Sequence, residues 1–482
     1  MTRRLALLLV VALPNCASMQ KERGHDDVSR IVQRRSGYRT GWERGTPEDR
    51  QIAERVAKLL TGGLTRERAV SIALINSPRL QQTYDSLDVS QADLVEAGLL
   101  SNPTIGGSVG FRMNGPGRSE FEVSVVQSFL DIFMLPLRRR VAEQEFVAAT
   151  LRVAHEALDT AAEVSKAFAE VQADAETVQL MRNISDAAQA AADLAQRLFD
   201  AGNVTERTQA SQRAVYEQAE LDLARDEMTL LEHREQLNRL LGLWGPRTEW
   251  TLAQRLPTLP DRDPIPDHLE RIAMKQRLDI GAAKRELALL DTALSLAKNS
   301  RYTGVVDVGA HVHQDPDGAV LFGPTLALEL PIFNQRQGMI GRLEAQRRQT
   351  QRRVDQLAVD TRSEVRLATA KLDMTRRASE RYERTLLPIR AKVLEQAQLE
   401  YNGMQIGLFE LLAAKQGQIE AVRSYIETVR DYWKARAELE RALGGRLPVA
   451  SPLPTTAPTP PPAPSTAPEP SPGAPSYVQG AR

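Results

Sequence analysis

The feature that most constrains this chain is a stretch in which a two-residue hydrophobic period changes abruptly into a helical one. Val306, Val308 and Val312 alternate with polar residues, and the alternation resumes after residues 315–318 (DPDG). A period of two is typical of a half-buried strand, and DPDG is a hairpin connection. From Pro331 the period is helical for about 60 residues. The fold must therefore attach a hairpin to a very long helix.

This hairpin and its long helix occur twice along the chain. Residues 104–130 also alternate, around the turn sequence NGPG at 114–117, and a long helical pattern follows. Near the ends of the two halves, Leu443-Gly444 repeats Leu241-Gly242 at an offset of 202 residues. Such a period is far longer than that of solenoid repeats. We therefore predict an α+β protein with an internally duplicated unit of helix, β-hairpin, long helix and long helix.

Prolines and turn signals divide the chain into six predicted parts. Prolines between the repeats mark a crossover linker, and the proline-rich end cannot bury a core, so it predicts a disordered extension. Before the first repeat, the pattern predicts one helix at 47–60. The parts are a signal peptide with a lipoprotein-type cysteine (1–16), an N-terminal periplasmic segment (17–60), a first repeat (61–250, with a hairpin at 104–130 and long helices at 138–200 and 205–242), a crossover linker (251–266), a second repeat (267–446, with a hairpin at 304–330 and long helices at 334–401 and 408–444) and the tail (447–482).

The long helical segments carry coiled-coil spacing. Val164, Phe168 and Val171 are separated by four and then three residues, and residues 419–433 show the same steps. Charged residues make up 26% of the chain and aromatic residues 5%, which favours long helices packed through narrow apolar seams. A helix over residues 139–200 would be roughly 90 Å long, at 1.5 Å per residue. Such a rod must pack against neighbouring helices along most of its length.

The N-terminus predicts export. Two arginines precede an apolar run at 5–13, which is too short to span a bilayer and has the size of a signal-peptide core. Cys16, the only cysteine, follows this run and resembles the acylation site of a bacterial lipoprotein. The alternative is ordinary secretory cleavage near Ala17 or Ser18. No later run of about 18 apolar residues predicts a transmembrane helix.

Charge and motif content exclude several classes of function. Sixty-two basic residues balance sixty-two acidic ones, so no global field favours nucleic acid. The sequence has no P-loop, no G-x-S-x-G, no G-x-G-x-x-G before a helix and no His-Glu zinc motif. We therefore expect no enzymatic activity, no cofactor and no resident metal site.

The predicted strands have the length that a tilted strand needs to cross a bilayer, about ten residues. In a soluble sandwich, the same alternation would turn the apolar face toward a protein core. Four strands are too few to close a barrel, and lipid does not tolerate an open sheet edge. If these strands enter a membrane, several chains must share one barrel.

Four segments resemble the TolC family of outer-membrane efflux channels, and the resemblance extends over residues 64–445. The segments are LTRERAVSIALINSPRL, AGLLSNPTIGGSVGF, ELPIFNQRQGMIG and IGLFELLAAKQ, and LPIFNQRQG is most similar to the CzcC branch, the outer components of metal-cation efflux systems. The resemblance implies a homotrimer whose twelve strands form one barrel in outer-membrane lipid. It also implies a periplasmic α-helical coiled-coil barrel that meets an adaptor protein (membrane fusion protein) and an inner-membrane pump, of the RND type in this branch.

Within this family framework, three groups of residues are candidate functional positions. Channel-lumen residues are predicted on the polar strand faces: Glu120, Glu122, Asp307, His311, His313 and Glu329. Turns at the far end of the rods are predicted as periplasmic tips that contact the adaptor: Gly202, Asn203, Gly403, Met404 and Gly407. Acidic residues near the tips are gate candidates: Glu395, Glu400 and Glu410. His311 and His313 share a face as metal ligands could, but paired histidines beside an exposed turn are more often wet lumen residues.

Two functional hypotheses from different classes follow. The first is a passive exit duct in the bacterial outer membrane, conducting a substrate such as heavy-metal cations, with drug efflux or type I secretion as alternatives for the cargo. The second is a secreted coiled-coil scaffold whose hairpins pack on protein.

Overall fold

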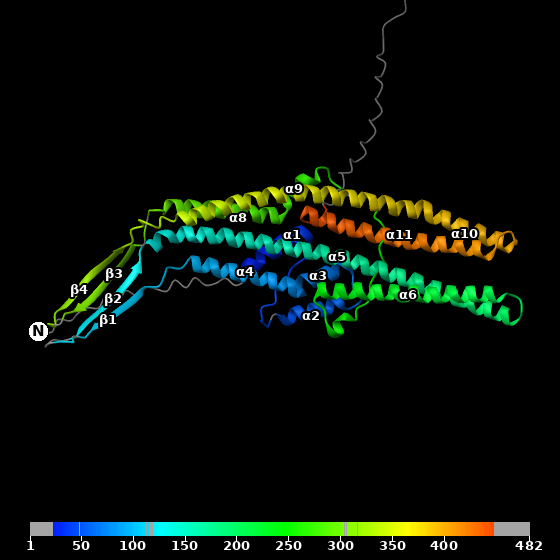
Figure 1. Ribbon diagram of the computed structural model, residues 1–482, viewed down its shortest axis with the longest axis horizontal. Helices are drawn as coiled ribbons and strands as arrows, with labels where there is room; N and C mark the ends of the chain where they lie inside the picture. Colours follow the sequence, from blue (N-terminus) through cyan, green and yellow to red (C-terminus); the bar gives the residue numbers. More distant parts are fainter. Residues whose placement is uncertain are drawn as a thin grey trace, which may run out of the picture.

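The computed structural model describes residues 23–447, except positions 48, 112, 115–118, 264, 303, 305 and 316. The predicted signal peptide, Cys16 and residues 448–482 of the predicted tail lie outside the described residues. The described chain is a long rod with a sheet at one end and two helical hairpins at the other (Figure 1).

The sheet contains both predicted hairpins. Its strands are antiparallel and follow one another in the order β1-β2-β3-β4. They are β1 (Thr104–Gly110), β2 (Glu120–Ser128), β3 (Val306–Gln314) and β4 (Val320–Leu328). At 7 to 9 residues, they are shorter than the predicted ten, because the chain leaves the ladder early at both ends. After β2, for example, Phe129 makes one last bond to Val306 before a helix begins at Leu130.

The first long hairpin consists of α5 (Leu130–Asp200) and α6 (Glu206–Leu241). The prediction that α5 begins at 138 is wrong. Pro136 favours a helix start beyond it, because proline cannot donate a hydrogen bond to the carbonyl four residues earlier. The helix nevertheless includes this proline and is 71 residues long in total, or roughly 105 Å. Pro136 costs the helix only one backbone hydrogen bond, and that bond lies near the helix end.

The second long hairpin is interrupted. Its ascending arm comprises α9 (Gln337–Arg381), a π-helical turn η2 (Tyr382–Leu386) and α10 (Leu387–Asn402), and its descending arm is α11 (Leu408–Leu443). The single helix predicted at 334–401 is therefore wrong in two respects. It begins three residues later, after Arg336 adopts a left-handed conformation with φ of 59°, and it contains a π-turn, which hydrophobic periodicity does not reveal.

Short helices surround the middle of the rod. They are α1 (Arg23–Ser36), α2 (Asp49–Leu60), α3 (Arg66–Asn76), α4 (Pro78–Ala97), η1 (Gly245–Thr248), α7 (Leu269–Gln276) and α8 (Leu278–Asn299). The prediction of a single helix before the first repeat missed α1. Val28 and Val32 are fully buried, but these two valines and Ile31 are few apolar residues for a 14-residue helix, so they make a weak helical pattern. Thr65 caps the start of α3, and its hydroxyl accepts the Arg68 N–H at 3.2 Å.

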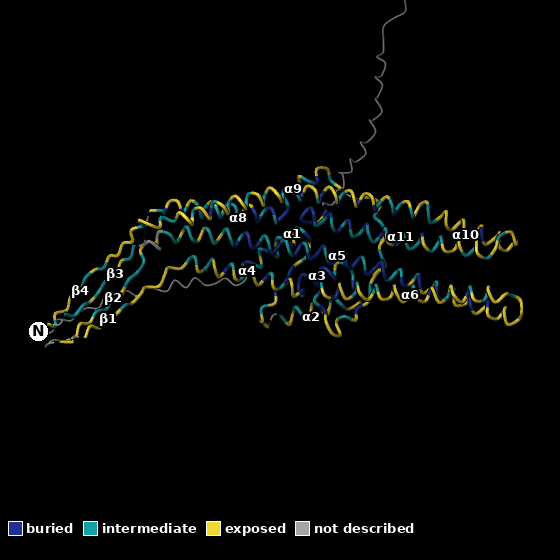
Figure 2. The backbone as a smooth tube through the Cα atoms, viewed as in Figure 1, coloured by how far each residue is buried: buried dark blue, intermediate teal, exposed yellow. Residues whose placement is uncertain are grey.

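The buried core lies at mid-length, whereas the tips and the sheet are largely exposed (Figure 2). One cluster joins α1, α3, α4, the middle of α5 and the end of α6. A second joins α7, α9 and the end of α11. Among the described helices, none combines the length and apolar character needed to cross a bilayer.

The two halves have equivalent packing as well as similar sequence. Gly242 ends α6 with φ of 67°, and a Cβ there would lie 2.5 Å from the Asn76 carbonyl oxygen at the end of α3. Gly444 ends α11 with φ of 75°, and a Cβ there would lie 3.3 Å from the Gln276 carbonyl oxygen at the end of α7. In both repeats, a left-handed glycine lets the descending long helix end against a short helix.

Candidate functional site

The sheet has two chemically distinct faces that run unbroken across all four strands. The register places Ile105, Val125, Ala310 and Pro324 in one row, and Val123, Val312 and Phe322 in another. All belong to one apolar face. Ile105 is 73% exposed and Phe322 76% exposed. The residues that the structure describes leave much of this face uncovered.

The opposite face carries most of the predicted lumen residues. Glu122 pairs with His313, Ser124 with His311, and Ser128 with Asp307, while Glu120 pairs with Gly110 on β1. Five of the six predicted residues thus lie on one polar face: Glu120, Glu122, Asp307, His311 and His313. Glu329 follows the last residue of β4, and its backbone approaches Gly304 so closely that a Cβ on that glycine would lie 1.8 Å from the Glu329 carbonyl oxygen. Their role as lumen residues stays a prediction.

The two histidines of the polar face have separate partners. His311 Nδ1 lies 2.9 Å from the Thr325 hydroxyl, and His313 Nε2 lies 2.9 Å from an Asp315 carboxylate oxygen. Within the described part of the chain, no three or more His, Cys, Asp or Glu residues are grouped so that they could hold a metal ion. The geometry fits polar side chains tied into the sheet and its turn.

The two tip turns have the same hydrogen bonds at an offset of 202 residues. Gly202 N–H donates to Phe199 O and Asn203 N–H donates to Leu198 O, as in a Schellman helix end. In the second tip, Met404 donates to Tyr401 O and Gln405 to Glu400 O. The tips therefore end their helices in the same way.

The left-handed residue of the second tip is not a glycine. Met404 has φ of 56° and is 94% exposed, whereas Gly403 and Gly407 have φ of −80° and −81°. Glycine therefore takes the left-handed position in the first tip, at Gly202, whereas Met404 takes it in the second. The residue could have been found by applying the 202-residue offset to Gly202.

The gate candidates lie in different places on the second hairpin. Glu400 and Glu410 line one groove between α10 and α11, together with Ile389, Val393 and Ala397. Glu395 is exposed on α10 and is not among the residues that line this groove. The structure thus brings two of the three predicted acids together.

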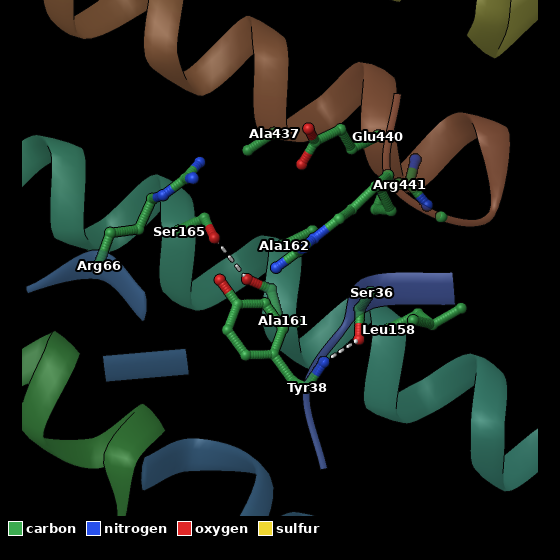
Figure 3. A pocket seen from close by; sticks show the side chains of 12 residues that line it. Ser36, Tyr38, Arg66, Leu158, Ala161, Ala162, Ser165, Ala437, Glu440 and Arg441 are labelled. Carbon is green, nitrogen blue, oxygen red and sulfur yellow. Dashed lines mark hydrogen bonds between the residues drawn. The ribbon is translucent and has the colours of Figure 1, made fainter. Parts of the chain in front are cut away.

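A small cavity at mid-length was not predicted from the sequence. It lies where the loop after α1, the start of α3, α5 and the end of α11 meet, with Tyr38, Arg66 and Glu440 in its wall (Figure 3). Burial raises the pKa of Glu440, although the positive charges of Arg66, Arg436 and Arg446 oppose the rise. These residues come from segments hundreds of positions apart, so no local pattern signals them.

The crossover linker forms a second unpredicted cluster. Asp263, with its side chain 4% exposed, accepts hydrogen bonds from the Tyr432 hydroxyl at 2.7 Å, from Arg376 at 2.9 Å and from Arg436 at 3.1 Å. Burial and the adjacent Asp263 raise the pKa of Tyr432 to about 12. We call these four residues the linker clasp.

Comparison with known proteins agrees with this architecture. Residues 69–243 match the family model described as outer membrane efflux protein. The cobalt-zinc-cadmium resistance protein CzcC of Cupriavidus metallidurans is 24% identical over 392 residues, which cover 80% of this chain and 90% of that protein. A membrane protein from Pseudomonas aeruginosa superimposes with a TM-score of 0.68 at 18% identity, covering 79% of this chain and 90% of that one. The CmeC outer membrane channel of Campylobacter jejuni also gives 0.68, at 15% identity and with 83% and 88% covered.

The two structures share the fold of this chain, and the family model and CzcC match its sequence. Residues 69–243 therefore carry a domain of the outer membrane efflux protein family, in a chain that is a distant homologue of CzcC over most of its length.

Proposed function

We propose that this protein is the outer-membrane exit duct of a tripartite efflux system. The observation that carries the proposal is the two-faced sheet at the end of a long helical rod. Its apolar face is exposed on all four strands, as a lipid-facing surface would be, and its acidic residues share the other face. A helical rod on the periplasmic side would extend the path away from the membrane.

The proposed assembly is a homotrimer with a twelve-stranded barrel. β1 and β4 form the two open edges of the sheet, and lipid would not tolerate them unpaired. In the rod, α5 packs against α6 and α11, and α11 packs against α9, so α6 and α9 lie at opposite sides (Figure 1). If β1 of each copy paired with β4 of the next, the strands would close into a barrel. If α6 packed against α9 of the next copy in the same way, the helices would close into a ring.

Exposed apolar residues on the outer helices support this closure. Leu221 and Met228 on α6 are seven residues apart and 63% and 54% exposed. Leu367 and Met374 on α9 are also seven apart and 56% and 59% exposed. A seven-residue apolar spacing is typical of helices that pack side by side.

The proposed partners are a periplasmic adaptor and an inner-membrane pump of the RND type, and the proposed contact with the adaptor is at the two tips. The duct itself has no energy source, so transport would be passive and would depend on the pump. The proposed cargo is heavy-metal cations, because the relative CzcC is named for cobalt, zinc and cadmium resistance. Lumen carboxylates attract cations, which is compatible with such a cargo.

A deletion strain tests the function and the cargo together. We expect deletion to lower tolerance to cobalt, zinc or cadmium and the full-length gene to restore it. The restored protein should remain in the outer-membrane fraction until detergent is added. Recovery in the soluble periplasm would exclude the duct and favour the secreted scaffold. Membrane location with unchanged metal tolerance would exclude the metal cargo and leave drug efflux or type I secretion.

A further inference from the structure

The π-turn in the second long hairpin marks one extra residue relative to the first hairpin. Buried seam residues of α5 recur on α9 at an offset of 201: Thr160, Val164, Ala167 and Val171 correspond to Thr361, Val365, Ala368 and Leu372, all below 6% exposure. Toward the tips the offset is 202, since Ala195 corresponds to Ala397 and the turn bonds repeat at that spacing. The register therefore changes between these two regions.

The extra residue falls at η2. Val178 and Ala195 are 17 residues apart on the uninterrupted α5, whereas their counterparts Ser379 and Ala397 are 18 apart. Within this interval, Leu387 N–H donates to the carbonyl of Tyr382, five residues earlier, which is the bond of a π-turn. Pro388 follows and has no N–H to donate to the carbonyl four residues earlier. Helical hydrogen bonding is therefore weakest at this point of the arm.

Packing also changes at η2. On the mid-rod side, α9 buries a continuous seam that ends at Ser379, which has no exposed surface. On the tip side, Ala397 is the one buried residue that α10 contains, and Ile389 and Leu399 are 52% and 58% exposed. The equivalent part of α5, residues 185–200, buries three residues: Ser185, Ala192 and Ala195. The tip half of the second hairpin is thus held much more loosely than that of the first.

The linker clasp holds the mid-rod side of the same point. Arg376 lies six residues before η2 and binds Asp263 along with the backbone carbonyls of Pro260 and Asp261, each at 2.7 Å. Its Nε also lies 3.0 Å from Glu380. Because Asp263 also binds Tyr432 and Arg436 on α11, the linker connects α9 to α11 on the mid-rod side of the π-turn.

We propose that η2 is the pivot about which α10 and the tip end of α11 move, and that Asp263 is the positioning residue that holds the pivot in place. The proposal deepens the proposed function, because this motion would open the periplasmic end of the duct. The clasp keeps α9 and α11 together, so displacement begins at residue 382 and does not spread into the mid-rod core.

The first test removes the extra residue. Deleting Arg384 and substituting Pro388→Ala gives the second arm the uninterrupted register of α5. Hydrogen exchange of the full-length protein in detergent should slow about tenfold over residues 387–402 relative to Pro388→Ala alone, which keeps the extra residue. Equal exchange in these two variants would overturn the pivot, as would wild-type exchange over 387–402 no faster than over 186–200.

The second test loosens the clasp. In Asp263→Asn, fast exchange should spread from α10 into residues 366–381, while the core segment 149–171 keeps its wild-type rates. Asp261→Asn is the matched control, because Asp261 binds Arg376 through its backbone carbonyl. If Asp263→Asn fails to fold, Tyr432→Phe, which removes one bond from the clasp, should show a smaller spread. Unchanged exchange at 366–381 in a folded clasp variant would overturn the role of Asp263.

A conductance measurement separates this inference from the proposed function. In planar bilayers, the deletion variant should open less often than Pro388→Ala, with the same conductance when open. If neither the wild type nor any variant conducts ions, the duct itself is rejected, while the exchange results still decide whether η2 is a pivot. If the wild type conducts and both variants open equally often, the pivot does not control opening.

Discussion

Gly202 and Met404 occupy the same position in the two tip turns, with left-handed φ angles of 72° and 56°, yet only one of them is a glycine. Their neighbours make matching hydrogen bonds, so the backbone demands the same conformation at both positions. A methionine side chain there costs roughly 1 kcal/mol in backbone energy. The second tip therefore stores strain that the first tip lacks.

This strain predicts opposite effects for two substitutions. Met404→Gly should stabilise the second turn by about 0.5–1 kcal/mol, because glycine adopts the left-handed region without steric cost. Gly202→Met should destabilise the first turn by a similar amount. Hydrogen exchange at residues 198–205 and 399–406 would report each turn separately. Effects of the same sign in both turns would contradict the argument. If Met404 contacts the adaptor, Met404→Gly should also weaken adaptor binding while stabilising the free protein.

The glycines that end the descending helices should differ in their tolerance of alanine. Both have positive φ, so both substitutions carry a backbone cost of about 1–2 kcal/mol. At Gly242 the new Cβ would also lie 2.5 Å from the Asn76 carbonyl oxygen, whereas at Gly444 the nearest atom is 3.2 Å away. We expect Gly242→Ala to lower stability by about 1–3 kcal/mol more than Gly444→Ala. Thermal unfolding in detergent measures the difference, and equal losses would contradict it.

Glu438 predicts a pH-dependent contribution to stability at the junction of the repeats. Its carboxylate lies 2.9 Å from Lys166 Nζ on α5 and 2.7 Å from Arg441. Burial alone would raise its pKa, but hydrogen bonds from Arg441 and Lys166 outweigh burial and hold the pKa below its ordinary value of 4.5. Because the pKa is lower in the folded state, the stabilisation is present above pH 4.5 and is lost as the pH falls through the folded-state pKa.

The test compares unfolding at about pH 7 and about pH 4. Glu438→Gln should lower stability at the higher pH and reduce the loss on acidification. Glu344→Gln is the control, since Glu344 pairs with Lys298 at 2.7 Å on the exposed surface, where water screens the pair. A Glu438→Gln profile parallel to that of the wild type would show that Glu438 does not link folding to protons. The carboxyl group of Asp159 contributes to stability with the opposite pH dependence, because burial raises its pKa.

The parts of the fold that could be predicted from sequence are those that local periodicity encodes. Alternation of Val306 and Val308 with polar neighbours predicts a strand whose two faces differ, and the observed register extends those faces over four strands. The two long hairpins follow from helical spacing and from the repeated leucine-glycine ends. α1 could not be predicted in the same way, because Val28, Ile31 and Val32 are the few apolar residues that mark its packed side.

The parts that could not be predicted depend on contacts between distant segments. Asp263 is one of two acids in a proline-rich linker, and its burial between Arg376 and Arg436 arises only when α9 and α11 meet. The π-turn leaves no composition signal. It is visible as a change of offset once burial identifies which residues of the two arms correspond. Of the candidate site, the polar face could be anticipated, whereas the left-handed Met404 and the clasp required the structure.

Adjacent residues on β4 provide a direct test of which sheet face meets lipid. Phe322 pairs with Val312 on the apolar face, and Leu321 pairs with His313 on the polar face. The two are 76% and 53% exposed, so neither is a core residue in the single chain. An arginine facing the bilayer midplane costs about 2–4 kcal/mol, whereas an arginine facing a water-filled lumen is tolerated. We therefore expect Phe322→Arg to reduce the detergent-extracted outer-membrane fraction strongly, and Leu321→Arg to leave it near the wild-type level while lowering cation conductance.

If both variants assemble equally well, the apolar face does not contact lipid, and the membrane assignment of the sheet fails. If Leu321→Arg is lost and Phe322→Arg assembles, the faces are reversed.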